Sequence, residues 1–458
     1  MANSKKPASS DLPQYLGQRL VALSAPGRRV TLALSGGVDS VVLLHLLQTL
    51  SSKLEFSLSA IHINHQLSPH AAEWAKFCTD LCAQYKIPLQ VQKVQVARRS
   101  KLGLEAAARA ARYQAFAELD CDVLLLAHHL DDQVETLLHN LLRGAGLAGA
   151  SGMPEVRQQA LHNSETSLLL ARPLIAVPRA TLLAYAEQHH LRWVEDESNT
   201  DSAFTRNFLR HEILPLIEGR FPAYRENLAR AAQHFAEADQ LLRELAVLDL
   251  GQVMRAEKLH LAALTALSPA RAMNVLRAYL EQQAVPAMDT ARIQEWLRQL
   301  LCARGDRQVA LGVAGLKLRR YRGEAWVELD KPALDPGWYV AWQGERKLRL
   351  EELGVSLSLF PAQGIGISLA KLTRAAVTIR LRQGGEKLQP SCGRPRRTLK
   401  HLLQEAGIPS WQRERLPLIY SGEQLVAVPG IGVDCAFQAI ATESALQMQW
   451  SDFSASQL

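Results

Sequence analysis

One turn near the start of the chain limits the possible folds more than any other sequence feature. The apolar run Arg29–Leu34 leads directly into Ser35–Ser40 (SGGVDS), and an apolar helical pattern follows. Two adjacent glycines let backbone N–H groups approach a ligand closely, the serines add hydroxyl donors, and the next helix points its positive end at the same place. The turn therefore predicts a phosphate site at the end of a buried strand. It lacks the lysine and spacing of a Walker loop, and a purely structural turn capped by Asp39 is the alternative.

Short apolar runs alternate with amphipathic helical patterns along the first ~215 residues, which predicts an α/β fold with a parallel sheet and helices on both faces. The runs are nearly continuously apolar, as in strands buried on both faces. The predicted strands are Arg29–Leu34, Phe56–His62, Leu89–Val94, Val123–Ala127 and Leu168–Ala171. The predicted helices are Ser40–Leu50, Ala71–Tyr85, Leu104–Leu119, Asp131–Leu142 and Arg179–His189.

The rest of the chain changes character twice. Residues 222–301 show helical periodicity without a strand signal, whereas residues 305–360 hold glycine-punctuated short strands such as Ala325–Leu329. A final unit mixes strands with a helix over Thr398–Ala406. The predicted domains are an α/β domain at 1–218, a mainly helical domain at 219–330, a linker with short strands at 331–370 and a small basic α+β domain at 371–449.

The basic charge is concentrated in the last of these domains. The whole chain has 52 Lys and Arg against 45 Asp and Glu, a net charge of +7. Residues 371–401 alone contain one acid, Glu386, and nine basic side chains: Lys371, Arg374, Arg380, Arg382, Lys387, Arg394, Arg396, Arg397 and Lys400. A basic patch of this density is typical of a protein that binds a phosphate-rich partner.

The cysteine pattern and the N-terminal sequence indicate the cellular compartment. The six cysteines are scattered without a C-x-x-C pair, so we expect ordinary thiols in a reducing compartment. The first 16 residues lack the apolar segment of a secretory signal. No apolar stretch approaches the roughly 20 residues of a membrane helix. We therefore expect a cytoplasmic protein with no membrane association.

Further polar groups lie where the predicted strands end. His62-Ile63-Asn64-His65 closes the second strand, and Ala127–Thr136 closes the fourth and begins a helix on which Asp132 and Glu135 share one face. Carboxylates at this place also suit the positive end of a helix, which is the structural alternative. The four histidines of these segments could suggest a transition metal, but no third ligand stands at a zinc-like spacing.

Two other groups of polar residues are candidates for the site. Glu105, Arg109 and Arg112 are spaced by four and three residues, so they share a helix face, where simple salt bridges are the alternative. Glu195–Asn199 is followed by Arg206–Arg210, in a segment that we predict to be a mobile loop.

Together these segments resemble two nested families. Ser35–Ser40 is similar to the SGGxDS loop of the PP-loop ATP pyrophosphatases, which split ATP into AMP and pyrophosphate while adenylating a substrate oxygen. The other segments, and a closing stretch from Ile379 to Gly430, resemble the tRNA(Ile)-lysidine synthetases. One departure is Leu67-Ser68, where many members have a Leu-Arg pair.

The resemblance implies a reaction. Members join L-lysine to C2 of cytidine 34 in the CAU anticodon of an isoleucine tRNA, so that the tRNA reads AUA instead of AUG. The base is first adenylated on O2 by ATP, with Mg²⁺ assisting, and AMP and pyrophosphate are released. The implied partners are ATP, L-lysine and that tRNA, and a homodimer is left open.

The resemblance also implies site residues. The pyrophosphate of ATP is expected on Ser35, Gly36, Gly37, Val38, Asp39 and Ser40, with Mg²⁺ on Asp39. The residues expected to act in catalysis are Asp39, Arg112, His128, Asp132 and Glu135. Lysine recognition is expected from Asp132 and Glu135, and Asn199 and Arg206 are expected to position lysine or the base. The expected tRNA-binding residues are Arg380, Arg382, Arg394, Arg396, Arg397 and Lys400.

Two other functions stay open at this point. A tRNA-thiolating PP-loop enzyme would share the fold, although that class commonly relies on cysteines, and no C-x-x-C pair is present here. A non-catalytic tRNA-binding factor that keeps a nucleotide-binding fold is the second alternative.

Overall fold

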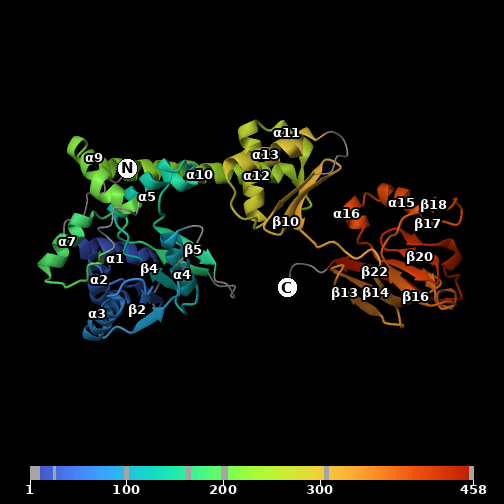
Figure 1. Cartoon of the computed structure of the whole chain (residues 1–458), viewed down its shortest axis with the longest axis horizontal. Helices are drawn as coiled ribbons and strands as arrows, with labels where there is room; N and C mark the ends of the chain where they lie inside the picture. The colour runs from blue at the N-terminus through green and yellow to red at the C-terminus, as the bar shows by residue number, and fades with distance from the viewer. Residues whose placement is uncertain are drawn as a thin grey trace. The chain divides into compact units, whose positions relative to one another are not determined.

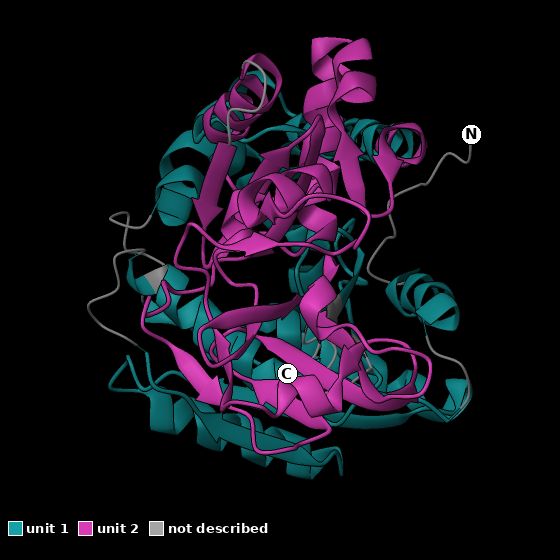
Figure 2. Ribbon diagram, turned by 90° about the vertical axis from the view of Figure 1, so that its right-hand side faces the viewer, with its two compact units in different colours: residues 1–245 teal, residues 246–458 magenta. Residues whose placement is uncertain are grey.

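The computed structural model describes residues 11–23, 27–96, 103–160, 167–197, 205–303 and 309–452. By its internal contacts the chain divides into two compact units, residues 1–245 and 246–458 (Figure 2). Each unit contains hydrophobic cores of its own.

The first unit is built on a six-stranded sheet, of which Figure 1 labels β2, β4 and β5. Its strands lie in the order β3-β2-β1-β4-β6-β5. Its strands are β1 (Arg29–Ala33), β2 (Ser57–Asn64), β3 (Leu89–Lys93), β4 (Val123–Leu125), β5 (Val156–Ala160) and β6 (Ser167–Ala171). All pairs are parallel except β5 with β6. The five parallel strands confirm the prediction, whereas β5 (VRQQA) was not predicted because an edge strand needs little apolar sequence.

Helices cover both faces of this sheet, as predicted. Val123 and Leu125 of β4 enter a core shared with α1, α2 and α7, while Leu124 between them enters a second core with Phe116 of α4, which follows from the alternation of side chains along a strand. The helices are α1 (Leu12–Leu23), α2 (Val38–Leu54), α3 (Ala71–Gln84), α4 (Leu104–Ala117), α5 (Leu130–Leu142), α6 (Leu147–Ala150), α7 (Arg179–Gln188), α8 (Thr205–Phe208) and α9 (Leu214–Arg220), with a π-helical turn η3 (Leu209–Ile213).

The strand order determines where a ligand can bind. From β1 the chain moves to β2 on one side, and β4 pairs with β1 on the other. In open parallel sheets, ligands bind at the carboxyl ends of the strands where the order reverses in this way. Ser35–Ser40 follows β1 and His128 and His129 follow β4, so the fold places the predicted site residues around this crevice.

A long helix, α10 (Tyr224–Val253), leads from the first unit into the second. The next residues form helices α11 (Leu261–Ala266), α12 (Pro269–Gln282) and α13 (Thr290–Cys302) and an antiparallel sheet of β7 (Met254–Arg255), β8 (Lys258–His260), β9 (Val309–Val313), β10 (Leu316–Tyr321) and β11 (Glu324–Leu329). Strands β7 and β8 lie where no strand was predicted. Their two-residue turn uses Ala256 and Glu257 at φ 46° and 65°, a conformation for which Asn-Gly is the usual sequence signal.

Two further sheets form the last part of the second unit, in the orders β12-β16-β19-β20-β21 and β13-β14-β22-β15. The strands are β12 (Tyr339–Ala341), β13 (Lys347–Leu350), β14 (Val355–Gln363), β15 (Ile367–Ser368), β16 (Val377–Arg380), β17 (Lys387–Leu388), β18 (Arg397–Thr398), β19 (Leu418–Ser421), β20 (Gln424–Val428), β21 (Gly432–Val433) and β22 (Ser444–Asp452). The helices are α14 (Leu369–Leu372), α15 (Leu399–Glu405) and α16 (Ser410–Arg413), with a 3-10 turn at Cys435–Phe437.

The segment 331–370, predicted as a linker with short strands, does contain strands, and these are part of the two sheets rather than a linker. It supplies β12, β13, β14 and β15, and β14 pairs with β22 from Val355 to Gln363. A boundary at 371 would therefore cut through one fold rather than separate two.

Two observations concern cysteines and membranes. Cys392 and Cys435 form a disulfide, so the expectation of free thiols is wrong for this pair, whose separation of 43 residues carries no spacing signal. Cys78, Cys82 and Cys121 are buried thiols, and Cys302 is an exposed one. No described helix is both long and apolar enough to cross a membrane.

Candidate active site

Serine hydroxyls close the turn that follows β1. Ser40 Oγ lies 3.0 Å from Ser35 Oγ, accepts the Gly36 N–H at 3.2 Å and donates to the Gly37 carbonyl at 2.9 Å. The Gly37 N–H donates to Ser35 Oγ at 3.3 Å. Both glycine N–H groups are thus used inside the turn, and the donors that remain are those of the first turn of α2, which have no acceptor within the helix. The N–H groups that this turn leaves for a ligand are therefore those at the N-terminus of α2, not those of the glycines.

Gly36 is required by the backbone. Its φ is +91°, and a Cβ there would lie 2.8 Å from Val194 Cγ2 and 3.2 Å from Cys78 Sγ. The Val194 N–H also donates to the Gly36 carbonyl at 3.0 Å. The glycine therefore permits the close packing that fixes the turn.

The N-termini of α2 and α5 meet through Asp39 and His129. Asp39 lies in the first turn of α2, and its Oδ2 is 3.6 Å from His129 Nε2. His129 caps α5, because its Nδ1 accepts the Asp132 N–H at 3.4 Å and its own N–H donates to Asp132 Oδ2 at 3.1 Å. Two helix N-termini, each with a partial positive charge, therefore point at one place.

The charge on His129 depends on this arrangement. The side chain is 2% exposed, and burial alone would lower its pKa. The carboxylates of Asp132, Asp39 and Asp131 outweigh burial and raise the pKa above the usual value. The carboxylates around His129 thus favour the protonated ring, whereas the hydrogen bond from the Asp132 N–H requires Nδ1 to be unprotonated.

Asp131 has a structural role. Its Oδ2 accepts the Arg179 N–H at 2.9 Å, and its Oδ1 accepts from Arg225 Nε at 2.6 Å. These contacts outweigh the effect of burial and lower the pKa of Asp131. The residue joins α5 to α7 and α10 and has little capacity left for a ligand.

Asp132 and Glu135 lie together and share one cation, Arg210. Glu135 is 2% exposed and accepts from Arg210 Nε at 2.6 Å and from its Nη2 at 2.9 Å. The same Nη2 lies 3.4 Å from Asp132 Oδ1. Burial raises the pKa of Glu135 by more than Arg210 lowers it. The predicted carboxylate pair is thus brought together, as the i, i+3 spacing indicated.

The residue that sequence analysis missed at this point is Arg210 itself. It stands on η3, a π-helical turn of the kind often found at functional sites. Arg206, which was predicted, instead donates to Thr136 Oγ1 at 3.3 Å. The available signal was the four-residue spacing of Arg206 and Arg210, which puts both on one helix face. Asn199 lies outside the described residues.

A group of basic side chains surrounds His128, which is also near Asp132. His128 Nδ1 is buried and has no hydrogen-bond partner among the described residues. Burial, followed by the positive charges of Arg172, Arg112 and Arg109, lowers the pKa of His128 to about 3 despite the opposing effect of Asp132. His128 is therefore a neutral imidazole beside several cations.

Arg172 is a second residue that sequence analysis missed. It directly follows β6 at the carboxyl edge of the sheet and is 2% exposed. Its Nη1 donates to the Pro154 carbonyl at 2.7 Å, and its buried Nε has no partner in the described chain. The carboxylate of the neighbouring Glu155 forms a salt bridge with Arg19 instead, with 2.7 Å between Oε2 and Nη1. A buried guanidinium with no carboxylate partner among the described side chains is costly, and burial lowers the pKa of Arg172 by more than its hydrogen bond with Tyr113 raises it.

The polar residues at the end of β2 bind backbone groups of neighbouring segments. His62 Nδ1 lies 2.9 Å from the Leu34 carbonyl and 3.5 Å from Cys78 Sγ, and burial lowers its pKa. The Asn64 side chain donates to the Ala71 carbonyl at 3.2 Å and accepts the Gln66 N–H at 2.9 Å. Both side chains thus hold the backbone at Leu34, Gln66 and Ala71 in place.

The donor set fits Mg²⁺. Within the described parts of the chain, no group of three or more His, Cys, Asp or Glu side chains could hold a metal ion alone. Mg²⁺ commonly uses one or two carboxylates together with substrate phosphates. Asp39 Oδ1 is buried and has no hydrogen-bond partner in the described structure, so it is the oxygen that such an ion would use.

The structure divides the predicted tRNA-binding residues into two sets. Arg396 forms two hydrogen bonds to the buried Asp434, and Arg380, Arg382 and Arg397 pair with Glu423, Glu386 and Glu405. Arg394 and Lys400 are exposed and make no ion pair with a described residue. The second set keeps its charge available for phosphate.

Comparison with known proteins identifies the whole chain. Family models match a PP-loop domain at residues 10–217, a TilS substrate binding domain at 259–326 and a TilS substrate C-terminal domain at 377–450. The tRNA(Ile)-lysidine synthase of Nitrosomonas europaea is 45% identical over 450 residues, 98% of each chain. The protein of that name from Ralstonia nicotianae is 40% identical over 96% of this chain and 97% of its own, and that from Coxiella burnetii is 38% identical over 89% and 90%. The chain belongs to the tRNA(Ile)-lysidine synthase family.

Proposed function

We propose that this chain uses ATP to ligate L-lysine to C2 of cytidine 34 in the CAU anticodon of isoleucine tRNA, through an O2-adenylated base. The observation that supports this most directly is the crevice at the ends of β1 and β4. There a helix N-terminus and Asp39 lie beside the acidic pair Asp132 and Glu135, and the basic group Arg112, His128 and Arg172 is nearby. Such a site can hold a triphosphate, a cationic amine and a charged intermediate at once.

The adenylation step requires that the triphosphate be held and its charge offset. The N–H groups of the first turn of α2 are suited to the pyrophosphate end. Asp39 would hold Mg²⁺, which when bound neutralises phosphate charge. Arg112 and Arg172 would then stabilise the negative charge that develops near the α-phosphate. As a neutral imidazole, His128 can donate one hydrogen bond and accept another.

The lysine amine needs a negatively charged site, which Asp132 and Glu135 supply. Arg210 now occupies these carboxylates through its guanidinium. Its weaker contact, at 3.4 Å to Asp132, is the one that an ammonium group can replace at least cost. Asp132 would therefore bind the amine while Glu135 keeps Arg210 in place. Asn199 and Arg206 are proposed to position lysine or the base.

Recognition of the tRNA is assigned to the second unit. Arg394 and Lys400 are the predicted tRNA-binding residues whose charges stay free for phosphates, and such contacts weaken as salt rises. The target cytosine has to leave the anticodon stack to reach the crevice. The predicted cytoplasmic location suits these substrates, and the homodimer is a proposal for sedimentation analysis.

The function is tested by incubating the protein with ATP, labelled lysine and a tRNA transcript. We expect label in isoleucine tRNA with a CAU anticodon and none in the same tRNA with a GAU anticodon. Continued release of pyrophosphate over many turnovers should require both lysine and the tRNA, because lysine has to displace AMP from each adenylated base. Absence of label from the CAU transcript would contradict the proposal.

A thiolation reaction is less well supported by this site. Cys78 is the cysteine that contacts the turn, since a Cβ on Gly36 would lie 3.2 Å from its Sγ. Burial raises the pKa of Cys78 to about 12, so its thiol stays protonated and is a poor nucleophile.

A further inference from the structure

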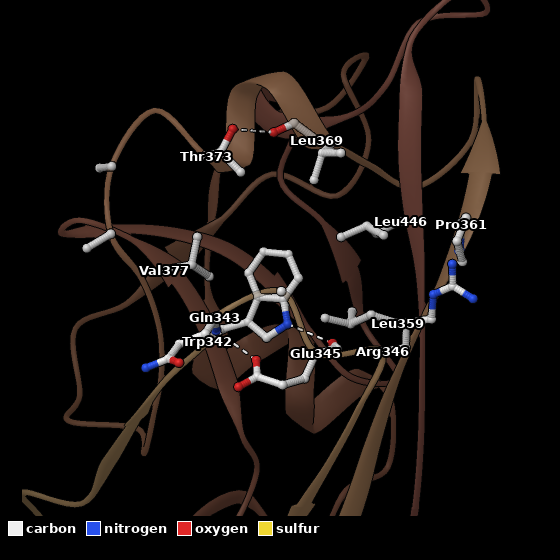
Figure 3. Close-up of a pocket in the computed structure, with 13 residues that line it drawn as sticks. Trp342, Gln343, Glu345, Arg346, Leu359, Pro361, Leu369, Thr373, Val377 and Leu446 are labelled. Carbon is white, nitrogen blue, oxygen red and sulfur yellow. Dashed lines mark hydrogen bonds between the residues drawn. The ribbon is translucent and has the colours of Figure 1, made fainter.

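A pocket of about 560 Å³ opens at one end of the two-sheet fold in the second unit (Figure 3). It lies largely in the segment before residue 377, to which neither the sequence motifs nor the matched C-terminal domain give a role. Its size falls within the roughly 300–1,000 Å³ of small-ligand sites. The lining residues come from the loop after β12, from β14, from α14 and from the ends of β16 and β22.

The interior of the pocket is aromatic and aliphatic. Figure 3 shows the six-membered ring of Trp342 directed toward the middle, with Val377 on one side and Leu359 and Leu446 on the other. The indole N–H donates to the Glu345 carbonyl at 2.8 Å, so the ring is held in place by its polar edge. The indole N–H thus needs no further acceptor. The apolar surface of the ring remains available to a flat ligand.

The rim of the pocket carries positive charge without an internal partner. Arg346 lines it, and Arg374 does not line it but stands in the chain between the lining residues Thr373 and Ala375. Both arginines are exposed, and neither makes an ion pair with a described residue. The acid that lines the pocket, Glu345, already accepts the Gln343 N–H at 2.7 Å. That hydrogen bond holds the Glu345 carboxylate at the Gln343 backbone, so Arg346 is the charged lining residue available to an anion, while the interior suits an aromatic ring.

We propose that this pocket binds an unpaired nucleotide of the tRNA, with its base on Trp342 and its phosphates beside Arg346 and Arg374. Unstacked bases of single-stranded RNA are commonly recognised by stacking on aromatic side chains. Bases within a duplex show only their edges in the grooves and could not enter an interior of this kind. The proposal rests on the proposed function, and it adds a contact to the tRNA beyond Arg394 and Lys400.

The first test measures the affinity of the full-length protein for isoleucine tRNA at several salt concentrations. In the double variant Arg346→Ala/Arg374→Ala, we expect Kd to rise about tenfold at 0.1 M salt and the log–log salt slope to fall by about 1 for each arginine. Arg349→Ala is the control, because Arg349 lies three residues after Arg346, on β13, but faces the opposite side from Leu348 and Leu350 and pairs with Glu351 at 3.6 Å. Its Kd should stay within about twofold of the wild type. An unchanged Kd and slope in the double variant would overturn the proposal.

The second test identifies the nucleotide. Ultraviolet cross-linking of the wild-type complex, followed by mass spectrometry, should join the peptide with Trp342 to a nucleotide that is unpaired in the tRNA. Trp342→Phe should keep most of the affinity and Trp342→Leu should lose about tenfold. Cross-links to paired nucleotides alone, or a change in sedimentation without a change in tRNA binding, would contradict the proposal, the latter indicating an interface between two copies.

These outcomes separate the pocket from the function. If the wild type incorporates lysine and both tests fail, only the pocket assignment is wrong. If the wild type neither binds the tRNA nor incorporates lysine, both proposals are wrong.

Discussion

At the residue scale, Asp39 is the side chain on which the use of ATP should depend most. Its Oδ1 is buried without a hydrogen-bond partner in the described structure, and it stands beside the N-terminus of α2. We expect Asp39→Asn, which keeps the shape but removes the charge, to lower lysine- and tRNA-dependent pyrophosphate release by at least about 100-fold. Binding of tRNA, measured by filter retention, should not change. Retained turnover would remove Asp39 from the site.

Arg172 allows a test that separates binding from stability. Because it is buried without a carboxylate partner among the described residues, its replacement by an apolar side chain of similar length should cost the fold little. We expect Arg172→Met to keep its melting temperature within a few degrees while kcat/KM falls about 10- to 100-fold, the value of one hydrogen bond to a charged group. Arg157→Met, at an exposed position on β5, is the control. A large loss of stability with unchanged kcat/KM would instead make Arg172 structural.

His128 gives a prediction about pH. Its pKa is about 3 in the folded chain and about 6.5 when unfolded. The unfolded chain therefore binds an extra proton between these values, so the stability that neutral His128 contributes is complete above pH 6.5 and is lost as pH falls toward 3. In an NMR titration, the imidazole signal that disappears in His128→Asn should stay constant from pH 8 to 5. The signal of His70, whose pKa hydrogen bonding to Glu73 raises, should move within that range. Movement of the His128 signal near pH 6.5 would contradict the assignment.

Local spacing predicted some of these side chains and not others. Asp132 and Glu135 could be paired from sequence because three residues on a helix return to the same face. Arg172 could not be added to His128 in this way, since their proximity depends on β6 lying beside β4 in the sheet. The hydroxyls of Ser35 and Ser40 were expected to point at a ligand, whereas they close the turn on itself. Competition between ligand and backbone for one donor is not visible in a motif.

At the element scale, the basic residues around β17, β18 and α15 should differ in their effect (Figure 1). We expect Arg394→Ala/Lys400→Ala to weaken tRNA binding about tenfold without changing the melting temperature, since neither makes an ion pair with a described residue. Arg396→Ala should instead lower the free energy of unfolding by about 1–3 kcal/mol, because it leaves the buried carboxylate of Asp434 short of a donor. Filter binding and thermal unfolding separate the two effects. Equal loss of tRNA affinity in both variants would show that Arg396 binds tRNA in spite of its ion pair with Asp434.

Elements were predictable where periodicity was long and strong. The parallel strands and their helices follow from apolar runs and amphipathic patterns, and the structure places them within a few residues of the prediction. The hairpin of β7 and β8 was missed because Ala256 and Glu257 adopt positive φ without a glycine or asparagine to announce it. The segment 331–370 was predicted as a linker with short strands, since nothing local shows that Val355–Gln363 pairs with residues some ninety positions later.

At the scale of the whole molecule, separate cores indicate where the chain can be divided. Residues 253–325 bury one core around Tyr279 and Leu300, and residues 348–446 bury another between their two sheets. A cut after Asp330 keeps the first of these cores complete, whereas a cut at 371 leaves β14 without β22.

A chain that ends at Asp330 should therefore keep the ATP site and lose most of the tRNA affinity. We expect its Kd for ATP to stay within about twofold of the wild type, because all residues of the crevice lie before 245, and its Kd for tRNA to rise by at least about 100-fold, as expected when several phosphate contacts are removed. A chain that ends at Lys371 is the informative comparison, since it keeps strands β12–β15 without their partners and should aggregate. Isothermal titration and light scattering measure both variants. If the shorter chain bound tRNA as tightly as the full protein, the charges and the pocket beyond residue 330 would have no part in holding it.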